Sequence, residues 1–355
     1  MEEVNCALIM AGGRGTRFWP KSTESKPKQF LQLVGNKTMI QETFERITRK
    51  IPSTQVFVVT CEKYKKIVME QLPNLSEKNI ILEPFGRNTA SCILLASIYI
   101  KQIYNNANIA VFPSDHIISN VDEFINILDM ANNFVKKNKK VIVTIGIKPD
   151  RPETGYGYIK CLDRKDNLNN INIIKVEKFV EKPNLETAKK YFDEGKYLWN
   201  AGMFIFNCDF MLSELKKNLE KSYNLLINLP NINSKDYYTE LKKAYEQCEA
   251  ISIDYAVMEK SNDIYVIPSE FGWDDIGTWK SLQRYIKPDN ESNIIKGDVK
   301  IYNSSNNVIY AGNKKIMLID IDNVFVIDSD DVIVIGKKDD LSNVHSYRNE
   351  LTEKI

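Results

Sequence analysis

Glycines and cationic residues lie close together near the start of the chain, in an arrangement suited to binding phosphate groups. The apolar run Val4–Ala11 passes directly into the loop Gly12-Gly13-Arg14-Gly15-Thr16-Arg17. Glycines let a loop bring backbone N–H groups close to an anion, and the arginines add positive charge. Lys26 and Lys28 follow within a dozen residues. These residues predict a site for several phosphate charges at once.

This loop differs from two common phosphate-binding motifs. A dinucleotide fingerprint would need its last glycine where Phe18 or Trp19 stands, and a P-loop would need a following Gly-Lys-Ser/Thr. A glycine-rich turn with solvated arginines is the alternative interpretation. The position directly after a strand-like segment, with Lys26-Pro27-Lys28-Gln29 beyond, favours the phosphate site.

The elements that would position this loop alternate between strand-like and helix-like segments. The expected strands are 4–11, 55–60, 79–82, 108–112 and 140–145. The expected helices are 39–50, 63–72, 89–104 and 121–137. This alternation predicts an α/β fold with a Rossmann-like, mainly parallel or mixed sheet flanked by helices. Ligands gather at the carboxyl ends of such strands, so the glycine loop and Ser114-Asp115 could converge on one cleft.

The second half of the chain changes its pattern twice. From about Tyr156 strands and helices are mixed, with expected strands 156–160, 173–180 and 203–206 and expected helices 185–195, 209–219 and 235–247. After Pro288, short Val/Ile runs are divided by Asn, Asp, Gly and Lys. We therefore expect two domains, residues 1–288 and a small all-β unit at 289–355.

Composition excludes several classes of protein. The chain has 355 residues and a net charge of +1, which gives no general attraction to nucleic acid or membrane. The longest apolar stretch, Cys92–Ile100, is too short to span a bilayer. An acidic amino terminus and six scattered cysteines without a CxxC pair predict a cytoplasmic protein with reduced thiols.

Seven segments, in order, resemble the signatures of the sugar-1-phosphate nucleotidyltransferases, and the first is most similar to the mannose-1-phosphate guanylyltransferase branch. They are AGGRGTRFWPKSTESKPKQF at 11–30, EPFGRNTA at 83–90, FPSDH at 112–116, TGYGYI at 154–159, FVEKP at 179–183, WNAGMF at 199–204 and WDDIGTW at 273–279. Seven ordered matches over nearly the whole chain are far more specific than any one of them.

The resemblance implies a magnesium-dependent reaction in which GTP and α-D-mannose 1-phosphate give GDP-mannose and diphosphate. A sugar phosphate is already ionised at neutral pH, so its attack on the α-phosphorus needs no general base. The protein must instead align two anions and neutralise charge. Transfer to another sugar 1-phosphate (glucose or a heptose) and a non-catalytic sugar-nucleotide-binding regulator of the same fold are the alternatives.

The resemblance also assigns the catalytic and metal-binding residues. Asp115 and Asp275 are expected to hold Mg²⁺, with Asp274 as the alternative to Asp275, although an isolated aspartate after a strand more often caps a helix. Arg17 and Lys28 are expected to face the triphosphate. The expected nucleotide-binding residues are Ala11, Gly12, Gly13, Arg14, Gly15, Thr16, Arg17, Lys28, Glu83, Arg87, Asn88 and Asp115.

Base and sugar recognition are assigned to later motifs. Glu83 could accept hydrogen bonds from N1 and N2 of guanine, whereas Asn88 could instead cap a helix. The expected sugar-phosphate residues are Gly157, Glu181, Lys182 and Asn200. Outside this family Gly157 and Asn200 would be turn residues, and Glu181-Lys182 would be a surface ion pair.

The family comparison has implications beyond the site. Tails of this kind resemble a short left-handed β-helix and often pack between subunits, so a homodimer is expected. Some relatives carry an additional phosphomannose isomerase domain, which we expect this chain to lack.

Overall fold

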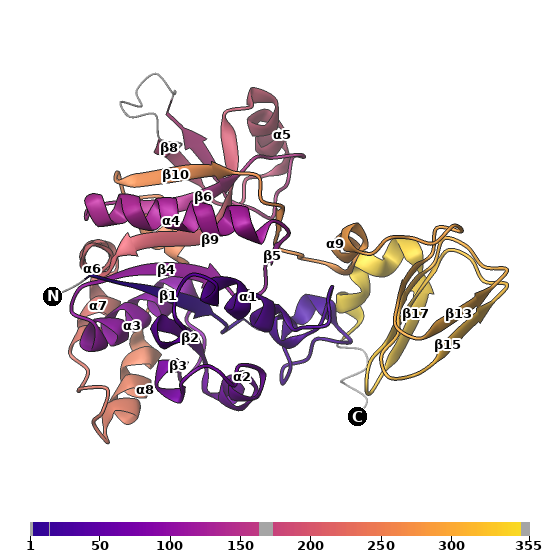
Figure 1. The fold of residues 1–355 in the computed structure, drawn as a ribbon, viewed down its shortest axis with the longest axis horizontal. Coiled ribbons are helices and arrows are strands. Elements are labelled where there is room, and N and C mark those ends of the chain that lie inside the picture. The colour runs from indigo at the N-terminus through magenta and orange to yellow at the C-terminus, as the bar shows by residue number, and fades with distance from the viewer. Residues whose placement is uncertain (1–2, 14, 163–172, 349–355) are drawn as a thin grey trace. The chain divides into compact units, whose positions relative to one another are not determined.

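The computed structural model describes residues 3–13, 15–162 and 173–348 (Figure 1). This described part divides into two compact units. The first contains residues up to Gly12, Thr43–Ser114 and Ile118–Trp273, and the second contains Gly13–Glu42, Asp115–Ile117 and the residues from Asp274 onward. The sequence suggested a division at Pro288, whereas the contacts group residues 13–42 and 274–288 with the C-terminal strands.

A mixed sheet forms the centre of the first unit (Figure 1). Its order within the described residues is β3-β2-β1-β4-β9-β6-β10-β8-β7. The strands are β1 (Val4–Met10), β2 (Val56–Cys61), β3 (Ile80–Glu83), β4 (Ala107–Pro113), β6 (Ile142–Ile147), β7 (Tyr158–Cys161), β8 (Ile174–Val180), β9 (Tyr197–Asn207) and β10 (Ile264–Ser269). β1 pairs in parallel with β2 and β4, whereas β9 is antiparallel to both β4 and β6. The mixed α/β fold expected from the sequence is confirmed.

Helices cover both faces of this sheet. They are α1 (Met39–Thr48), α2 (Lys65–Gln71), α3 (Asn88–Ile103), α4 (Val121–Lys137), α5 (Leu185–Glu194), α6 (Cys208–Asn218), α7 (Glu220–Ile227) and α8 (Tyr237–Gln247). α3 shares a buried core with α6, α7, α8 and alternate residues of β1 and β2. α4 covers the opposite face, where the ring centroids of Phe124 and Phe112 lie 5.8 Å apart. No helix among the described residues is long and apolar enough to cross a membrane.

Two elements of the first unit escaped the sequence analysis. β10 joins β6 in parallel and β8 in antiparallel orientation, and α7 packs between α6 and α8. The run Ile264-Tyr265-Val266-Ile267 gave a usable strand signal. α7, with eight residues, is too short for a clear helical period.

The second unit contains small sheets built from short strands, as expected after Pro288. The strands are β12 (Ile294–Lys296), β13 (Val299–Tyr302), β14 (Val308–Tyr310), β15 (Ile316–Ile319), β16 (Val324–Asp328) and β17 (Ile333–Lys337). β12, β14 and β16 pair in parallel, as do β13 and β15, and β17 closes against β16 in antiparallel orientation. α9 (Trp279–Leu282) and the 3-10 segment η9 (Lys338–Tyr347) also belong to this unit, whereas β5 (Ile117–Ile118) and β11 (Trp273–Asp274) cross the division.

The N-terminal loop is fixed within the second unit by a shared core. Phe18 packs edge-on against Trp279, with ring centroids 5.3 Å apart, and the Trp279 indole N–H donates to the Trp19 carbonyl at 2.9 Å. Lys296 Nζ donates to the carbonyls of Leu33 and Gln32 at 2.8 and 2.9 Å. These contacts explain why residues 13–42 cluster with the C-terminal strands.

Buried asparagines join successive strands of the C-terminal unit. Asn307 Oδ1 accepts from Val324 N at 3.0 Å, and its Nδ2 donates to Ile321 O at 2.8 Å. Asn293 Oδ1 in turn accepts from Asn307 N at 3.0 Å. A buried backbone group that loses its partner costs free energy, so this ladder stabilises the stacked strands.

We predict that Asn307→Ala lowers the free energy of unfolding of the C-terminal unit by about 2–4 kcal/mol, because Val324 N and Ile321 O lose their partners. Thermal unfolding followed by tryptophan fluorescence would measure the change. Asn313→Ala is the control, because Asn313 is exposed and bonds Asp330 at the surface. Equal melting temperatures for the two variants would contradict the prediction.

Candidate functional site

Lys28 forms the centre of a charged cluster in the second unit. It begins the 3-10 turn η2 (Lys28–Phe30), and its side chain is only 8% exposed. Nζ lies 2.9 Å from Asp115 Oδ2 and also donates to the main-chain oxygen of Asp275. Residues far apart in the sequence, expected to act together, are therefore brought to one ammonium group.

The Asp115 carboxylate is held in its ionised form. Loss of water around it would raise its pKa, but the charges of Lys28 and His116 and the hydrogen bond from Lys28 outweigh this. The pKa of Asp115 consequently lies below its usual value. An ionised carboxylate at neutral pH is the form that binds a cation.

Arg17 and the Asp275 carboxylate border the same glycine. A Cβ built on Gly277 would lie 3.7 Å from Arg17 Nη1 and 3.7 Å from both Asp275 carboxylate oxygens. Ile276, which lies between Asp275 and Gly277 in the sequence, has φ of 40° although it is β-branched. Such backbone is strained and is found where the surrounding structure imposes it, often at functional sites.

The Asp274 carboxylate forms several bonds within the protein. Oδ1 accepts from Ile276 N at 2.9 Å, while Oδ2 accepts from Tyr285 Oη at 3.0 Å and pairs with the Arg284 guanidinium. The side chain is buried. Both oxygens of the Asp274 carboxylate are therefore engaged within the protein, which makes Asp274 a poor ligand for an added group.

The glycine loop is placed against Lys28. A Cβ on Gly15 would lie 2.5 Å from Lys28 N, and Gly15 has φ of 51°, so only glycine fits here. Gln29 Nε2 donates to Gly13 O at 3.0 Å, and Thr16 and Arg17 begin the turn η1 (Thr16–Phe18). Arg14, expected to close over phosphates, lies outside the described residues.

The donor set suits a hard divalent cation. Asp115 and Asp275 offer carboxylate oxygens, the ligands that Mg²⁺ prefers. Within residues 3–13, 15–162 and 173–348, no group of three or more His, Cys, Asp or Glu side chains could hold a metal ion. A cation at these two aspartates would therefore complete its coordination with water and phosphate oxygens, as Mg²⁺ commonly does.

Glu83 is a buried carboxylate in the first unit beside the start of the glycine loop. Its Oε1 accepts from Tyr245 Oη at 2.5 Å, and Oε2 would lie 2.9 Å from a Cβ built on Gly12. Burial raises the pKa of Glu83 to about 7, against the lowering effect of the Tyr245 hydrogen bond. Sequence reasoning found Glu83 but not Tyr245, which α8 supplies from 162 residues away.

Other expected nucleotide residues already have partners within the protein. Arg87 Nε donates to Tyr245 O at 3.1 Å and Nη2 to Glu246 O at 2.6 Å, so its guanidinium caps the end of α8. Asn88 begins α3 with φ of 64°, and its Oδ1 accepts from Thr89 N at 2.8 Å. Ala11 N donates to the Val59 carbonyl at 2.8 Å within the sheet. Their nucleotide-binding roles stay predictions.

The expected sugar-phosphate residues gather around Gly157. A Cβ there would lie 2.6 Å from Glu181 Oε2 and 3.4 Å from Asn200 Cβ. Lys182 Nζ donates to Glu181 Oε1 at 2.5 Å, and Lys182 has φ of 44°. Asn200 Nδ2 donates to Asp254 Oδ1 at 3.1 Å. Asp254 was not identified from the sequence, because it lies in a π-helical turn, η7 (Asp254–Met258), that leaves no periodic signal.

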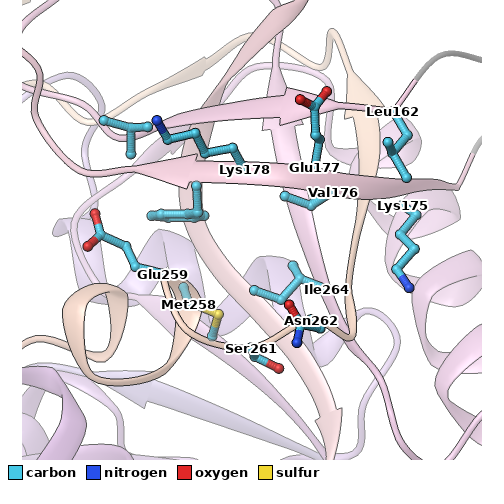
Figure 2. A pocket seen from close by; sticks show the side chains of 12 residues that line it. Leu162, Lys175, Val176, Glu177, Lys178, Met258, Glu259, Ser261, Asn262 and Ile264 are labelled. Atoms are coloured by element: carbon cyan, nitrogen blue, oxygen red, sulfur yellow. The ribbon is translucent and has the colours of Figure 1, made fainter.

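A groove of about 690 Å³ lies beside this group (Figure 2). Residues 175–180 of β8 form one wall, and Met258, Glu259, Ser261 and Asn262 face them from the turn after η7. Gly157, Glu181, Lys182 and Asn200 are not among the described residues that line it. It connects to them through Glu259, whose Oε1 accepts from Glu181 N at 3.1 Å.

Comparison with known proteins gives a consistent result. The sequence pattern of the nucleotidyl transferase family matches residues 6–292. A mannose-1-phosphate guanylyltransferase of Salmonella montevideo is 41% identical over 86% of this chain and 64% of its own length. One from Escherichia coli is 37% identical over 95% of this chain and 73% of its own length. The chain thus spans about two thirds of the length of these relatives.

Solved structures are similar as well. A crystal structure from Thermus thermophilus, described as mannose-1-phosphate geranyltransferase, superposes with a TM-score of 0.84 at 28% identity and covers 98% of this chain and 99% of that one. A Helicobacter pylori protein described as mannose-6-phosphate isomerase has a TM-score of 0.62 at 25% identity and covers 76% of this chain and 99% of that one.

The raised pKa of Glu83 predicts a stability that depends on pH. In the unfolded chain the carboxyl ionises near 4.5 and in the folded chain near 7, so the free energy of unfolding decreases as the pH rises from about 4.5 to about 7. Glu83→Gln removes this effect. The free energy of unfolding of Glu83→Gln, relative to that of the wild type, should therefore increase by about 3 kcal/mol between pH 4 and pH 8. Chemical denaturation across this range would measure it. Glu246→Gln, at an exposed site, is the control, and a pH-independent difference for Glu83→Gln would contradict the prediction.

Proposed function

We propose, from the premise that this chain belongs to the nucleotidyl transferase family, that it transfers GMP from GTP to α-D-mannose 1-phosphate. The products are GDP-mannose and diphosphate. The names of relatives that are 37–41% identical over 86–95% of this chain support this choice of substrates.

The Lys28 cluster is the observation that carries the proposal. A buried ammonium group against an ionised carboxylate, with Arg17 and a second aspartate nearby, has the charges that a triphosphate and a divalent cation require. We assign the triphosphate of GTP to this cluster and to the glycine loop that contacts Lys28.

In the proposed reaction, a phosphate oxygen of the sugar phosphate forms a new bond to the α-phosphorus of GTP. The bond from that phosphorus to the bridging oxygen breaks, and diphosphate leaves with both bonding electrons. No proton has to be removed from the nucleophile. Lys28 and Arg17 donate hydrogen bonds to phosphate oxygens and so stabilise the charge that develops during transfer.

Asp115 and Asp275 are the proposed ligands for Mg²⁺. When bound, this cation would neutralise phosphate charge and fix the orientation of the triphosphate. Lys28 keeps Asp115 ionised and holds the main chain of Asp275, so it orders the residues that would receive the cation.

Glu83 is the proposed reader of the base. Guanine presents N1–H and N2–H donors on one edge, and an ionised carboxylate can accept both. Because burial raises the pKa of Glu83 to about 7, binding of these donors would compete with protonation. GTP affinity should therefore increase as the pH rises through 7.

Gly157, Glu181, Lys182 and Asn200 are the proposed sugar-phosphate residues. Gly157 lets the Glu181 carboxylate approach its main chain closely, and Lys182 brings positive charge for the phosphate. The strained φ of Lys182 supports a functional reason for its conformation. Transfer to another hexose phosphate would use the same groups, so assays with several sugars must decide between them.

The C-terminal unit supports two further proposals. Short strands that follow one another along the chain pair in parallel, as they do where a chain winds into a β-helix. This pairing supports a left-handed β-helix. Exposed apolar side chains on β13, β15 and β17, among them Tyr302, Met317, Ile319 and Ile335, support a homodimer formed through this unit. A cytoplasmic protein is in keeping with the six cysteines, none of which forms a disulfide bond within the described residues.

We predict that wild-type protein with GTP, mannose 1-phosphate and Mg²⁺ releases diphosphate, and that Lys28→Ala lowers turnover by about 10²–10³-fold through loss of a transition-state donor. Lys66→Ala is the control, because Lys66 is an exposed lysine on α2 that pairs with Glu70. An enzyme-coupled diphosphate assay with a panel of NTPs and sugar 1-phosphates would measure this. Diphosphate release with glucose 1-phosphate alone would show that glucose 1-phosphate is the sugar substrate. No diphosphate release with any pair of NTP and sugar 1-phosphate would favour the non-catalytic regulator.

A second prediction separates the two neighbouring aspartates. Asp275→Asn should require more Mg²⁺ for activity, because it loses a charged ligand. Asp274→Asn should lower the melting temperature, because it weakens the bonds to Arg284 and Tyr285. Thermal unfolding and magnesium titration of both variants would test this, and the reverse pattern would show that Asp274 is the ligand.

A further inference from the structure

Asp254 lies in a segment that the nucleotide motif holds in place. Ile253 N donates to Thr89 Oγ1 at 2.8 Å, and Ala90 N donates to Ile251 O at 3.1 Å. Thr89 and Ala90 follow Asn88 in the first turn of α3. The turn that carries Asp254 is therefore held by the motif at 83–90, which also contains the expected nucleotide residues Glu83, Arg87 and Asn88.

The same turn is also tied to the sugar motifs. Asn200 Nδ2 donates to Asp254 Oδ1 at 3.1 Å. Glu259, which directly follows η7, accepts from Glu181 N at 3.1 Å. π-helical turns are rare and often occur at functional sites. Asp254 thus has a defined position relative to both Asn200 and Glu181.

The contacts of Asn200 show which way its amide points. Its Oδ1 accepts from Gly202 N at 3.1 Å, a backbone donor that identifies this atom as the oxygen. Thr144 Oγ1 lies 3.1 Å from the same oxygen. Nδ2 is therefore directed at Asp254, and the Asn200 oxygen already has protein partners. These contacts suit a residue that orients a carboxylate better than one that accepts from a sugar.

Asn200 connects the carboxylates of Asp254 and Glu181, because its amide bonds Asp254 while its Cβ and Glu181 Oε2 both border Gly157. Burial raises the pKa of Asp254 to about 6, with a further contribution from the charge of Glu181 and an opposing one from Lys182. Asn200 supplies a hydrogen bond that keeps Asp254 in place. Neighbouring hydroxyl groups of a pyranose ring are donors at a spacing that two adjacent carboxylates can accept.

We propose that Asp254 is a specificity-determining residue of the sugar site, accepting a hydrogen bond from one hexose hydroxyl while Glu181 accepts from a neighbouring one. Asn200 is then a positioning residue that acts through Asp254. This assignment rests on the proposed function and adds to it a residue that the sequence motifs do not contain.

Deoxy analogues of the sugar phosphate provide the test. For the wild type, removing the hydroxyl that Asp254 accepts should lower kcat/KM by ~10- to 100-fold, the usual effect of losing a hydrogen bond to a charged group. Asp254→Asn should lower kcat/KM for the parent sugar by a similar factor, through KM for the sugar, with KM for GTP unchanged. The kcat/KM of Asp254→Asn should then be the same for the parent sugar and for the analogue that lacks this hydroxyl, and should still decrease when other hydroxyls are removed.

Asn200→Ala provides a second route to the same result. If Asn200 acts through Asp254, the kcat/KM of Asn200→Ala should lose its dependence on the same hydroxyl. If Asn200 instead contacts the sugar directly, the variant should lose its dependence on a different hydroxyl. Glu177→Gln is the control, because Glu177 is an exposed carboxylate on β8 that pairs with Lys160. If Asp254→Asn is active and its kcat/KM changes with every deoxy analogue as that of the wild type does, the assignment is overturned and the proposed function is unaffected. No turnover by the wild type would instead overturn the proposed function.

Discussion

An ammonium group removed from water must find acceptors, and the partners of Lys28 determine the arrangement of the charged residues around it, to which we assign the triphosphate. Nζ bonds the carboxylate of Asp115 and the main chain of Asp275, while Gly15 packs against its backbone. Loss of the ammonium group would leave the Asp115 carboxylate with burial as the main influence on its pKa. The charge that we propose binds phosphate therefore also stabilises the local structure.

Strained backbone at three of the motifs depends on the packing around it. Asn88, Lys182 and Ile276 have positive φ values, which are unfavourable for residues other than glycine by roughly 1–2 kcal/mol each. Ile276 keeps this conformation because its side chain is buried in the core of the second unit and its N–H is held by Asp274. The core packing thus offsets the strain and fixes the position of Asp275.

Local sequence signals predicted the parts of the structure that depend on local order. The first-half strands and helices occur within a few residues of their expected bounds, and α4 occupies the expected range. The gathering of Lys28, Asp115 and Asp275 followed from motif order rather than from any local pattern. By contrast, Tyr245 beside Glu83 and the capping of α8 by Arg87 depend on contacts between distant segments, which periodicity and turn chemistry do not encode.

The motifs themselves mix residues that can face a ligand with residues that orient them. Asp274 is directed at Arg284 and Tyr285, whereas the carboxylate of the next residue, Asp275, lies near Arg17. Asn200 similarly directs its amide at Asp254, a residue outside every motif. A motif identifies the segment that forms a site, but the contacts of each side chain decide whether it binds the substrate or holds the residue that does.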